Sequence, residues 1–234
     1  PIQVYVGEPI EVGRDRGAAA EQLRRDVVAL VHRAQDEYPD DGTGQWLPLV
    51  HGHGALTAAN GFRDQAEVLV KTRFAADRVG ATKMDRPEWV AVNEKTREVV
   101  VTLTNNSERG AAGKPGTDAA NPRAGNQLGQ IVRWREANDD PAATTFSWDM
   151  LALAGDPGAA DPAWKGSFAG DAFANPDGVR FDPAGRLWVM TDVSPSRLNK
   201  GEFQRFGNNQ MLAFEPATRS FRRFLTGPVG CEIT

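Results

Sequence analysis

The chain has 234 residues, of which 40% are hydrophobic and 25% are charged, so it can form one large domain or part of one. Its formal net charge of -4, without any run of Lys or Arg, argues against binding to nucleic acid or to an acidic membrane surface. The single cysteine, Cys231, excludes an internal disulfide framework, and no segment approaches the ~20 apolar residues that span a bilayer.

The N-terminal part, residues 1–83, predicts two helices around a short strand over 45–50. In residues 18–37 the apolar side chains recur at helical spacing, which predicts an amphipathic helix with an apolar face of Leu23, Val27, Leu30 and Val31. Residues 63–77 predict a second helix that ends at Gly80. Its apolar side would consist of Ala66, Leu69, Val70, Phe74 and Ala75.

From residue 84 onward the pattern is that of β-strands. Strands are predicted at 88–93, 98–104, 128–136 and 145–153, and again at 177–182, 186–192, 208–215 and 219–225. The two groups begin alike, because PEWVAVN (87–93) and PDGVRFD (176–182) each place Pro and an acid before a short alternating strand. Repeated strand groups are typical of β-propeller blades. We therefore expect 84–234 to hold about two blades and the start of a third, as a fragment of a larger single propeller domain.

Two long links join the second and third predicted strands of each group, at 105–127 and 193–207. In an antiparallel meander such links lie at the same end of the sheet as the start of the first strand. Long loops rich in Asn, Gly and Arg on an acid-bearing face are the expected place for binding chemistry.

Three acids occupy the same position in the repeat, at Glu88, Asp177 and, in GPVGCEI (227–233), at Glu232. Carboxylates directed at a common axis repel one another unless a cation neutralises them. Their oxygen atoms suit calcium, magnesium or ferric iron rather than zinc. The alternative is that each acid only caps a turn at the start of its strand.

Two arginines accompany these acids. Arg86 lies two residues before Glu88, and Arg109 lies in the loop after the second strand. A guanidinium group beside a metal cluster can bind two phosphoryl oxygens at once, which makes both residues candidates for phosphate binding. Alternatively, Arg86 forms only a salt bridge with a neighbouring carboxylate.

Other candidates are weaker. His51 and His53 form an H-x-H pair without a visible third partner, so we interpret them as turn residues. The chain contains no nucleophile elbow, Walker loop or dinucleotide fingerprint. The tryptophans fall mostly in strands and predict the core of the blades: Trp46, Trp89, Trp134, Trp148, Trp164 and Trp188.

Several motifs in consistent order resemble the PhoX-type alkaline phosphatases, over residues 41–234. They include GTGQWLPLVHG (42–52), MDRPEW (84–89), TLTNNSERG (102–110), NPRAGNQLGQIVRW (121–134), FSWDMLALAGDP (146–157), NPDGVRFDPAGRLWVMTD (175–192) and FLTGPVGCEIT (224–234). Residues 1–40 follow no pattern of the family, and the cysteine motif that supplies an iron ligand in the family has no match here.

The resemblance implies a six-bladed propeller that is secreted to the periplasm for phosphate acquisition and hydrolyses phosphate monoesters with ferric iron and calcium ions. It further implies that Glu88, Asp177 and Glu232 bind metal. We expect Arg86 and Glu88 to be catalytic. The resemblance implies that Arg86 and Asn106 contact substrate, and Arg109 is expected to do so from its position in the loop. The partners expected are small phosphate monoesters, with no nucleic acid and no membrane insertion, and we expect a monomer.

Two further hypotheses remain open for the function. A calcium-dependent lactonase-type propeller shares the Asp-Gly…Gly-Arg-Leu-Trp motif, and a non-catalytic propeller scaffold would use the acids to hold one structural calcium. The arginines favour the phosphatase, because a lactone offers no dianion for them to bind. The chain opens on Pro1 without a signal peptide, and we expect a fragment that is inactive by itself.

Overall fold

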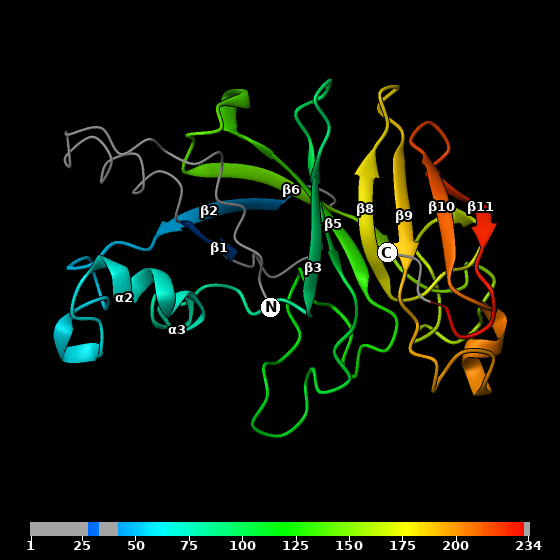
Figure 1. Ribbon diagram of the computed structural model, residues 1–234, viewed down its shortest axis with the longest axis horizontal. Coiled ribbons are helices and arrows are strands. Elements are labelled where there is room, and N and C mark those ends of the chain that lie inside the picture. The colour runs from blue at the N-terminus through cyan, green and yellow to red at the C-terminus, as the bar shows by residue number, and fades with distance from the viewer. Residues whose placement is uncertain (1–27, 33–41, 232–234) are drawn as a thin grey trace. The chain divides into compact units, whose positions relative to one another are not determined.

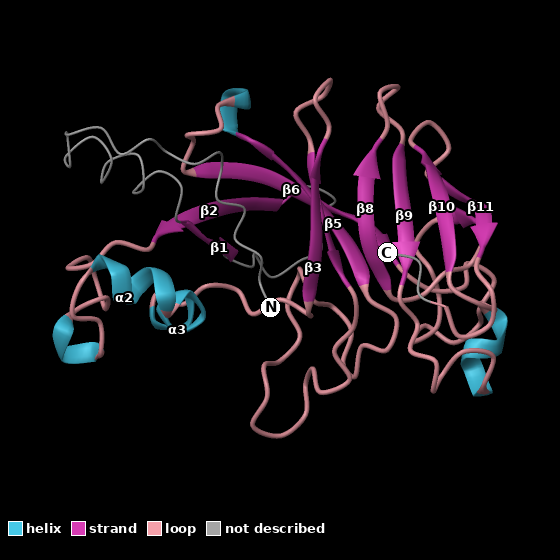
Figure 2. Ribbon diagram, in the orientation of Figure 1, coloured by secondary structure: helices cyan, strands magenta, loops and turns pink. Residues whose placement is uncertain are grey.

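The computed structural model describes residues 28–32 and 42–231. It confirms a mainly β protein with a small helical part (Figures 1 and 2). The chain groups into two compact units, of which one includes Thr43–Lys83 and Glu136–Ser147 and the other includes Met84–Arg135 and Trp148–Thr234. Within the described residues, no helix is long and apolar enough to cross a membrane.

The first unit contains an antiparallel pair of strands, of which the sequence predicted only the second. Strand β1 (Val28–His32) pairs with β2 (Gly42–Pro48), with Leu30 opposite Trp46. The helix predicted over 18–37 is therefore wrong at 28–32, and its remaining residues lie outside the described part of the chain. A short apolar run such as VALVH fits a helix or a strand equally well, and here the pairing with β2 decides.

The helix predicted over 63–77 is present as two short helices, α2 (Gln65–Val70) and α3 (Thr72–Arg78), with a break at Lys71. Asp64 caps the first helix by accepting the backbone N–H of Glu67 at 2.8 Å. Gly80 follows the second with φ +80°. The backbone N–H groups of residues 80 and 81 bind the carbonyls of residues 77 and 76, which is a Schellman ending and confirms the predicted C-cap.

The buried side of these helices differs from the prediction. Val68 and Ala75 are buried and pack with Leu49, Leu56 and Phe62. Two residues assigned to the apolar side, Val70 and Phe74, are instead 86% and 70% exposed. The break at Lys71 rotates the second helix relative to the first, so a single helical period does not describe both.

The eight strands predicted after residue 84 are all present. The first four are β3 (Pro87–Val92), β4 (Val99–Leu103), β5 (Gln130–Glu136) and β6 (Thr145–Leu153), in a six-stranded sheet of order β1-β2-β6-β5-β4-β3. The others are β8 (Pro176–Phe181), β9 (Leu187–Thr191), β10 (Gln210–Glu215) and β11 (Ser220–Thr226), in a sheet of order β7-β11-β10-β9-β8. The short β7 (Ala169–Gly170) pairs in parallel with β11.

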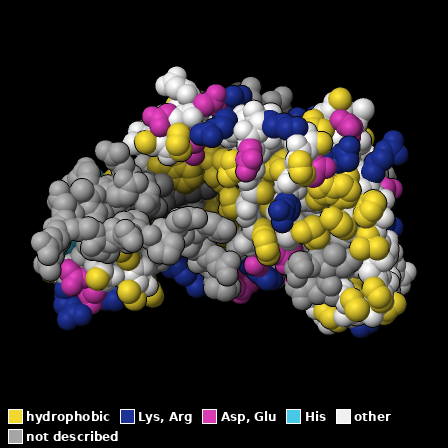
Figure 3. All heavy atoms as spheres, turned by 45° about the horizontal axis from the view of Figure 1, so that its top comes forward, with side chains coloured by type: hydrophobic (Ala, Val, Ile, Leu, Met, Phe, Trp, Pro, Cys, Tyr) yellow, Lys and Arg dark blue, Asp and Glu magenta, His cyan; other side chains and the backbone are white. Residues whose placement is uncertain are grey.

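The main core lies in the second unit and consists of aliphatic and phenylalanine side chains, with Phe173, Phe206 and Phe221 almost fully buried. The predicted tryptophan core is present only in part: among the described residues Trp148 is buried and Trp164 packs half-buried against the main core, whereas Trp89 is 49% exposed. Apolar side chains also remain at the surface (Figure 3), and they include Val90 and Val92 of β3.

Strands β3 and β8, the edge strands of the two sheets, lie next to each other (Figure 1). The hydroxyl of Thr102 donates to the backbone carbonyl of Asp177 at 2.6 Å, and that of Thr104 donates to the carbonyl of Pro176 at 2.9 Å. The Asn175 amide group returns a bond to the carbonyl of Thr104 at 3.0 Å. Side chains of β4 thus fix the start of β8.

Candidate functional site

The two acids Glu88 and Asp177 occupy equivalent β-bulges. In the first sheet Pro87 lies opposite Leu103, but the next pair is Val90 with Val101, so β3 holds one extra residue. In the second sheet the pairing of β8 with β9 slips in the same way, between Pro176 and Val179. A bulge redirects the side chains that it contains, and bulges are common beside active sites. The sequence repeat is therefore also a repeat of backbone geometry.

A left-handed residue precedes each acid by two positions. Arg86 has φ 48° and Asn175 has φ 54°, and the carbonyls of both residues accept a bond from the end of the neighbouring strand, from the N–H of Thr104 and of Asp192. Gly230 has φ 79° in the third copy of the motif. The acid of that copy, Glu232, lies outside the described residues. A left-handed residue two positions before the acid thus occurs in all three copies of the motif.

One hydroxyl group connects the two bulges. Thr102 accepts the backbone N–H of Trp89 at 3.1 Å and donates to the backbone carbonyl of Asp177 at 2.6 Å. The backbone directly after Glu88 and the backbone of Asp177 thus meet on the same side chain of β4. The structure thereby brings together the starting segments of two consecutive sheets.

The carboxylates at these positions are suitable donors for a hard cation. Asp177 is buried, with 8% exposure, and the side chain of Glu88 is 23% exposed. Burial disfavours a carboxylate whose charge is not neutralised, and hard cations prefer carboxylate oxygens as ligands. Among the described residues, no three or more His, Cys, Asp or Glu side chains lie close enough together to hold a metal ion. The third predicted ligand, Glu232, lies outside the described residues.

Arg86 is the accessible cation of the site, because its side chain is 57% exposed. Its guanidinium donates to Glu88 Oε1 at 3.1 Å and, at a longer 3.4 Å, to Asn105 Oδ1. The salt bridge that the sequence offered as an alternative is therefore present. It holds the guanidinium beside the carboxylate and leaves much of it open to a ligand.

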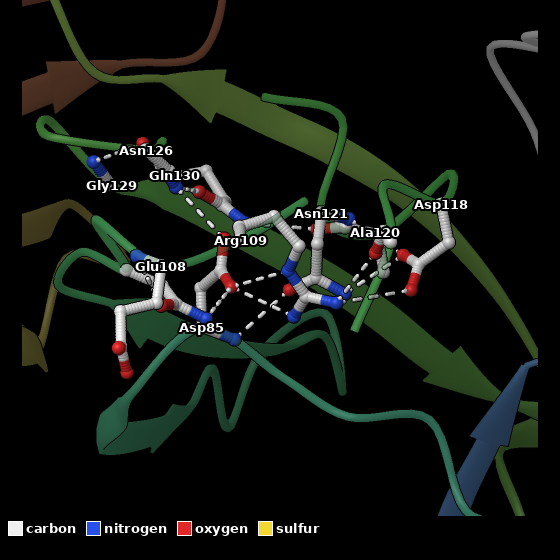
Figure 4. Close-up of polar contacts among 11 residues, drawn as sticks. Asp85, Glu108, Arg109, Asp118, Ala120, Asn121, Asn126, Gly129 and Gln130 are labelled. Carbon is white, nitrogen blue, oxygen red and sulfur yellow. Dashed lines mark hydrogen bonds and ion pairs between the residues drawn. The ribbon is translucent and has the colours of Figure 1, made fainter. Parts of the chain in front are cut away.

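Arg109 has a different environment. Its side chain is 1% exposed and binds Asp85 Oδ1 through Nε at 2.8 Å and Nη2 at 2.7 Å, while Nη1 donates to the carbonyl of Gly116 (Figure 4). Asp118 Oδ2 lies 3.7 Å from Nη1. A guanidinium surrounded in this way by protein oxygens favours a structural role over direct contact with substrate.

Asn106 belongs to the same buried network, because its Nδ2 donates to Asp85 Oδ1 at 2.9 Å. Further amides complete it (Figure 4): Asn126 donates to Asp85 Oδ2 at 3.0 Å, and Asn121 accepts the backbone N–H of Asp85 at 2.9 Å. Reasoning from sequence overlooked Asp85. The available signal was its position directly before Arg86 in MDRPEW, opposite a loop rich in asparagine.

His51 and His53 lie in a turn, as expected, where the N–H of His53 binds the carbonyl of Val50. Cys231 is a free, exposed cysteine.

Comparisons with known proteins found one matching family and one similar solved structure. The sequence profile of the family described as "Alkaline phosphatase PhoX" matches residues 8–234. Among solved structures, the chain is similar to "Pseudomonas fluorescens PhoX in complex with vanadate, a transition state analogue", with 48% identity and a TM-score of 0.81 over 88% of this chain. The chain spans 36% of the length of that structure. No curated protein resembles the chain closely enough to count as a match.

Proposed function

The chain belongs to the PhoX family of alkaline phosphatases, and from this we propose that it is part of an enzyme that releases inorganic phosphate from phosphate monoesters. The observation that carries the proposal is the pairing of an exposed Arg86 with Glu88 at the start of β3, a strand that lies beside β8, which begins with the equivalent acid Asp177. A cationic fork beside carboxylates is the arrangement that binds a dianionic phosphoryl group next to a cation.

The two four-stranded meanders are, in this proposal, consecutive blades of one larger propeller that begins near residue 84, after an N-terminal segment of residues 1–83. The repeated bulge and the repeated left-handed residue support it, since both place an acid at the start of a first strand. Gly230 would begin a third blade. A fragment with two blades cannot close a ring, so we expect activity only in the complete protein.

The metal ligands in this proposal are Glu88, Asp177 and Glu232. Their oxygens suit hard cations, and calcium and ferric iron remain the predicted ions. Cations bound to these carboxylates would supply Lewis-acid polarisation of the phosphoryl oxygens. The residues of this chain have the complementary tasks of holding the cations apart from bulk solvent and of orienting the phosphoryl group.

Arg86 has the clearest role in orientation. Its ion pair with Glu88 holds the guanidinium in place before substrate arrives, and its exposed side can donate to two phosphoryl oxygens. Negative charge that accumulates on those oxygens in the transition state strengthens these bonds, so Arg86 contributes to catalysis as well as to binding. Asn106 donates to Asp85 and so anchors the loop after β4. In this proposal it is also a candidate for contact with substrate.

The remaining assignments follow from the same proposal. The substrates are small phosphate monoesters, the protein acts as a monomer without nucleic acid or membrane insertion, and it is located in the periplasm or secreted. These assignments depend on the family rather than on any contact in this chain.

A matched pair of variants tests the role of Arg86. Arg86→Gly removes the guanidinium and places at φ 48° the residue that adopts this backbone conformation most easily. Arg97→Gly is the control, because Arg97 has φ 63° in the turn at the other end of β3 and β4. In the full-length protein we expect Arg86→Gly to lower kcat/KM for p-nitrophenyl phosphate at least about 100-fold and Arg97→Gly to leave it unchanged.

The same assay distinguishes the other hypotheses. Phosphatase activity that survives Arg86→Gly unchanged would remove the basis of the proposed site. Hydrolysis of gluconolactone without phosphatase activity would identify a lactonase, and absence of both activities in the metal-loaded full-length protein would favour a scaffold.

A further inference from the structure

The strongest unassigned feature is the fully buried ion pair of Asp85 and Arg109 (Figure 4). Asp85 is 0% exposed, and its carboxylate accepts bonds from Arg109, Asn106 and Asn126. An ion pair that is removed from water gives little net stability compared with a well-packed apolar pair. Its presence here therefore needs an explanation other than stability.

The position of Asp85 in the chain gives that explanation. Asp85 directly precedes Arg86, and its own N–H is held by Asn121 at 2.9 Å. Both the backbone and the side chain of Asp85 are thus fixed. The next residue, Arg86, has a left-handed backbone, which costs a non-glycine residue free energy and persists only where the surroundings enforce it. The network around Asp85 is the structure that enforces it.

The same network fixes the long loop between β4 and β5. Arg109 lies in this loop, and its backbone N–H and carbonyl bind residues 106 and 125. Its side chain also reaches the carbonyl of Gly116 at 2.9 Å. Through its backbone and its guanidinium, Arg109 therefore ties three places of the loop to the residue before Arg86. The loop also contains Asn105, whose Oδ1 lies 3.4 Å from the Arg86 guanidinium.

We propose that Asp85 and Arg109 form a positioning pair, which sets the place of the Arg86 guanidinium and the Glu88 carboxylate for the phosphoryl group. Neither residue touches substrate, so both act through Arg86 and Glu88. This inference rests on the proposed phosphatase function. It assigns to Arg109 the task of holding the phosphate-binding residue rather than binding phosphate itself.

Arg109→Lys is the sharpest variant, because it keeps the charge and loses the planar fork that binds Asp85 through two nitrogens. Loss of such a supporting contact costs about 10- to 100-fold in activity at comparable sites. In the full-length protein we expect kcat/KM for p-nitrophenyl phosphate to fall within this range. We also expect vanadate to raise the Tm of this variant less than that of the wild type.

Arg133→Lys provides the matched control. Arg133 forms a similar bidentate pair with Asp149 in the same sheet, at 2.9 and 2.6 Å, away from the starts of the strands. We expect Arg133→Lys to lower Tm while kcat/KM and the vanadate effect stay within about two-fold of wild type.

A double-variant cycle with Arg86→Gly tests whether Arg109 acts through Arg86. Once the Arg86 side chain is absent, Arg109→Lys should change kcat/KM by no more than about two-fold, because no group is left to be positioned. Losses that multiply in the double variant would overturn the inference. A loss of Tm without loss of kcat/KM in Arg109→Lys would also overturn it, and would leave the proposed function intact if Arg86→Gly is inactive.

Two further outcomes are decisive. If Arg86→Gly retains wild-type activity, both the proposed site and the positioning pair are wrong. If Arg109→Lys does not yield folded protein, Asp118→Asn takes its place, because it removes the charge 3.7 Å from Arg109 Nη1 in a more exposed position. That variant should show a smaller loss with the same dependence on Arg86, and additive losses would again overturn the inference.

Discussion

At the scale of single residues, backbone conformation decides where the acids point. Arg86, Asn175 and Gly230 share a left-handed φ, and the first two are not glycines. Such a conformation costs a residue with a Cβ about 1–2 kcal/mol. Both non-glycine residues are held by a bond from the neighbouring strand to their carbonyl. The conformation of Arg86, directly before the Pro-acid pair, is therefore one that its surroundings must hold in place.

Gly129 illustrates how closely the strands approach at this end of the sheet. It has φ +80°, and a Cβ there would lie 2.3 Å from the carbonyl oxygens of both Leu103 and Thr104. Gly113 has φ +73°, with nothing within 4 Å of such a Cβ. A comparison of alanine substitutions at Gly129 and Gly113 therefore separates the effect of a steric clash from the effect of backbone strain.

We predict that Gly129→Ala lowers the free energy of unfolding by about 1–3 kcal/mol more than Gly113→Ala does. Both variants introduce the same left-handed strain, and only the first forces β5 away from β4. Chemical denaturation of the two variants measures the difference. Equal losses would mean that the end of β4 moves freely, which contradicts the fixed contacts described for Thr104.

At the scale of elements, the first hairpin of each sheet has a turn that begins with an Asp or Asn side chain bound to backbone N–H groups, and the turn after β3 is one residue longer than the turn after β8. Asp182 accepts the N–H groups of Ala184 and Arg186 at 2.9 Å and the indole N–H of Trp188 at 3.1 Å. Asn93 has the corresponding place between β3 and β4 and accepts the N–H of Lys95 at 3.0 Å. The bond from the Arg186 N–H, followed by that from Trp188, lowers the pKa of Asp182 below its ordinary value of 3.8.

The sign of this pKa shift gives a pH-dependent prediction. Because the pKa of the folded state is lowered, the stabilisation by Asp182 is fully present above pH 3.8 and is lost as the pH falls through the folded pKa. The difference in Tm between wild type and Asp182→Asn should therefore shrink as the pH falls from neutral to about 3.

The control for this experiment is Asn93→Ala, whose cost in Tm should not depend on pH, because the amide does not titrate. A Tm difference for Asp182→Asn that stays constant below pH 3.8 would show that the charge of Asp182 makes no contribution.

At the scale of the whole molecule, the proposed metal site depends on acids from successive sheets. Glu88 and Asp177 start neighbouring edge strands, and in the proposed site their carboxylates would repel each other unless a cation lies between them. A bound cation stabilises the folded state by about 2.7 kcal/mol when it is present at 100 times its dissociation constant.

We therefore predict that a chelator lowers the Tm of the full-length protein and that added calcium or ferric iron restores it. In the variant Glu88→Gln with Asp177→Asn, the chelator should have a much smaller effect. Thermal unfolding with and without chelator measures both. A chelator effect of equal size in the double variant would place the cation elsewhere.

Part of this molecule follows from sequence alone. Alternation of apolar residues and the recurring Pro-acid motif determine the eight strands after residue 84, since each strand must bury one face. The motifs also identify the family, which the comparisons confirm. Apolar periodicity predicted a helix for VALVH at 28–32, where pairing with β2 produces a strand. It also predicted a single helix where the chain forms two short ones, because the helix breaks at Lys71.

Only the tertiary structure decided which of several similar residues are exposed to a ligand and which are buried. Arg86 and Arg109 have the same side chain and both lie near acids in the sequence, yet one is 57% exposed and the other 1%. Burial depends on contacts between residues far apart in the chain, such as that of Asp85 with Asn126, and no local pattern encodes them. The sequence therefore determined which chemical groups are present, and the fold determined which of them can reach a ligand.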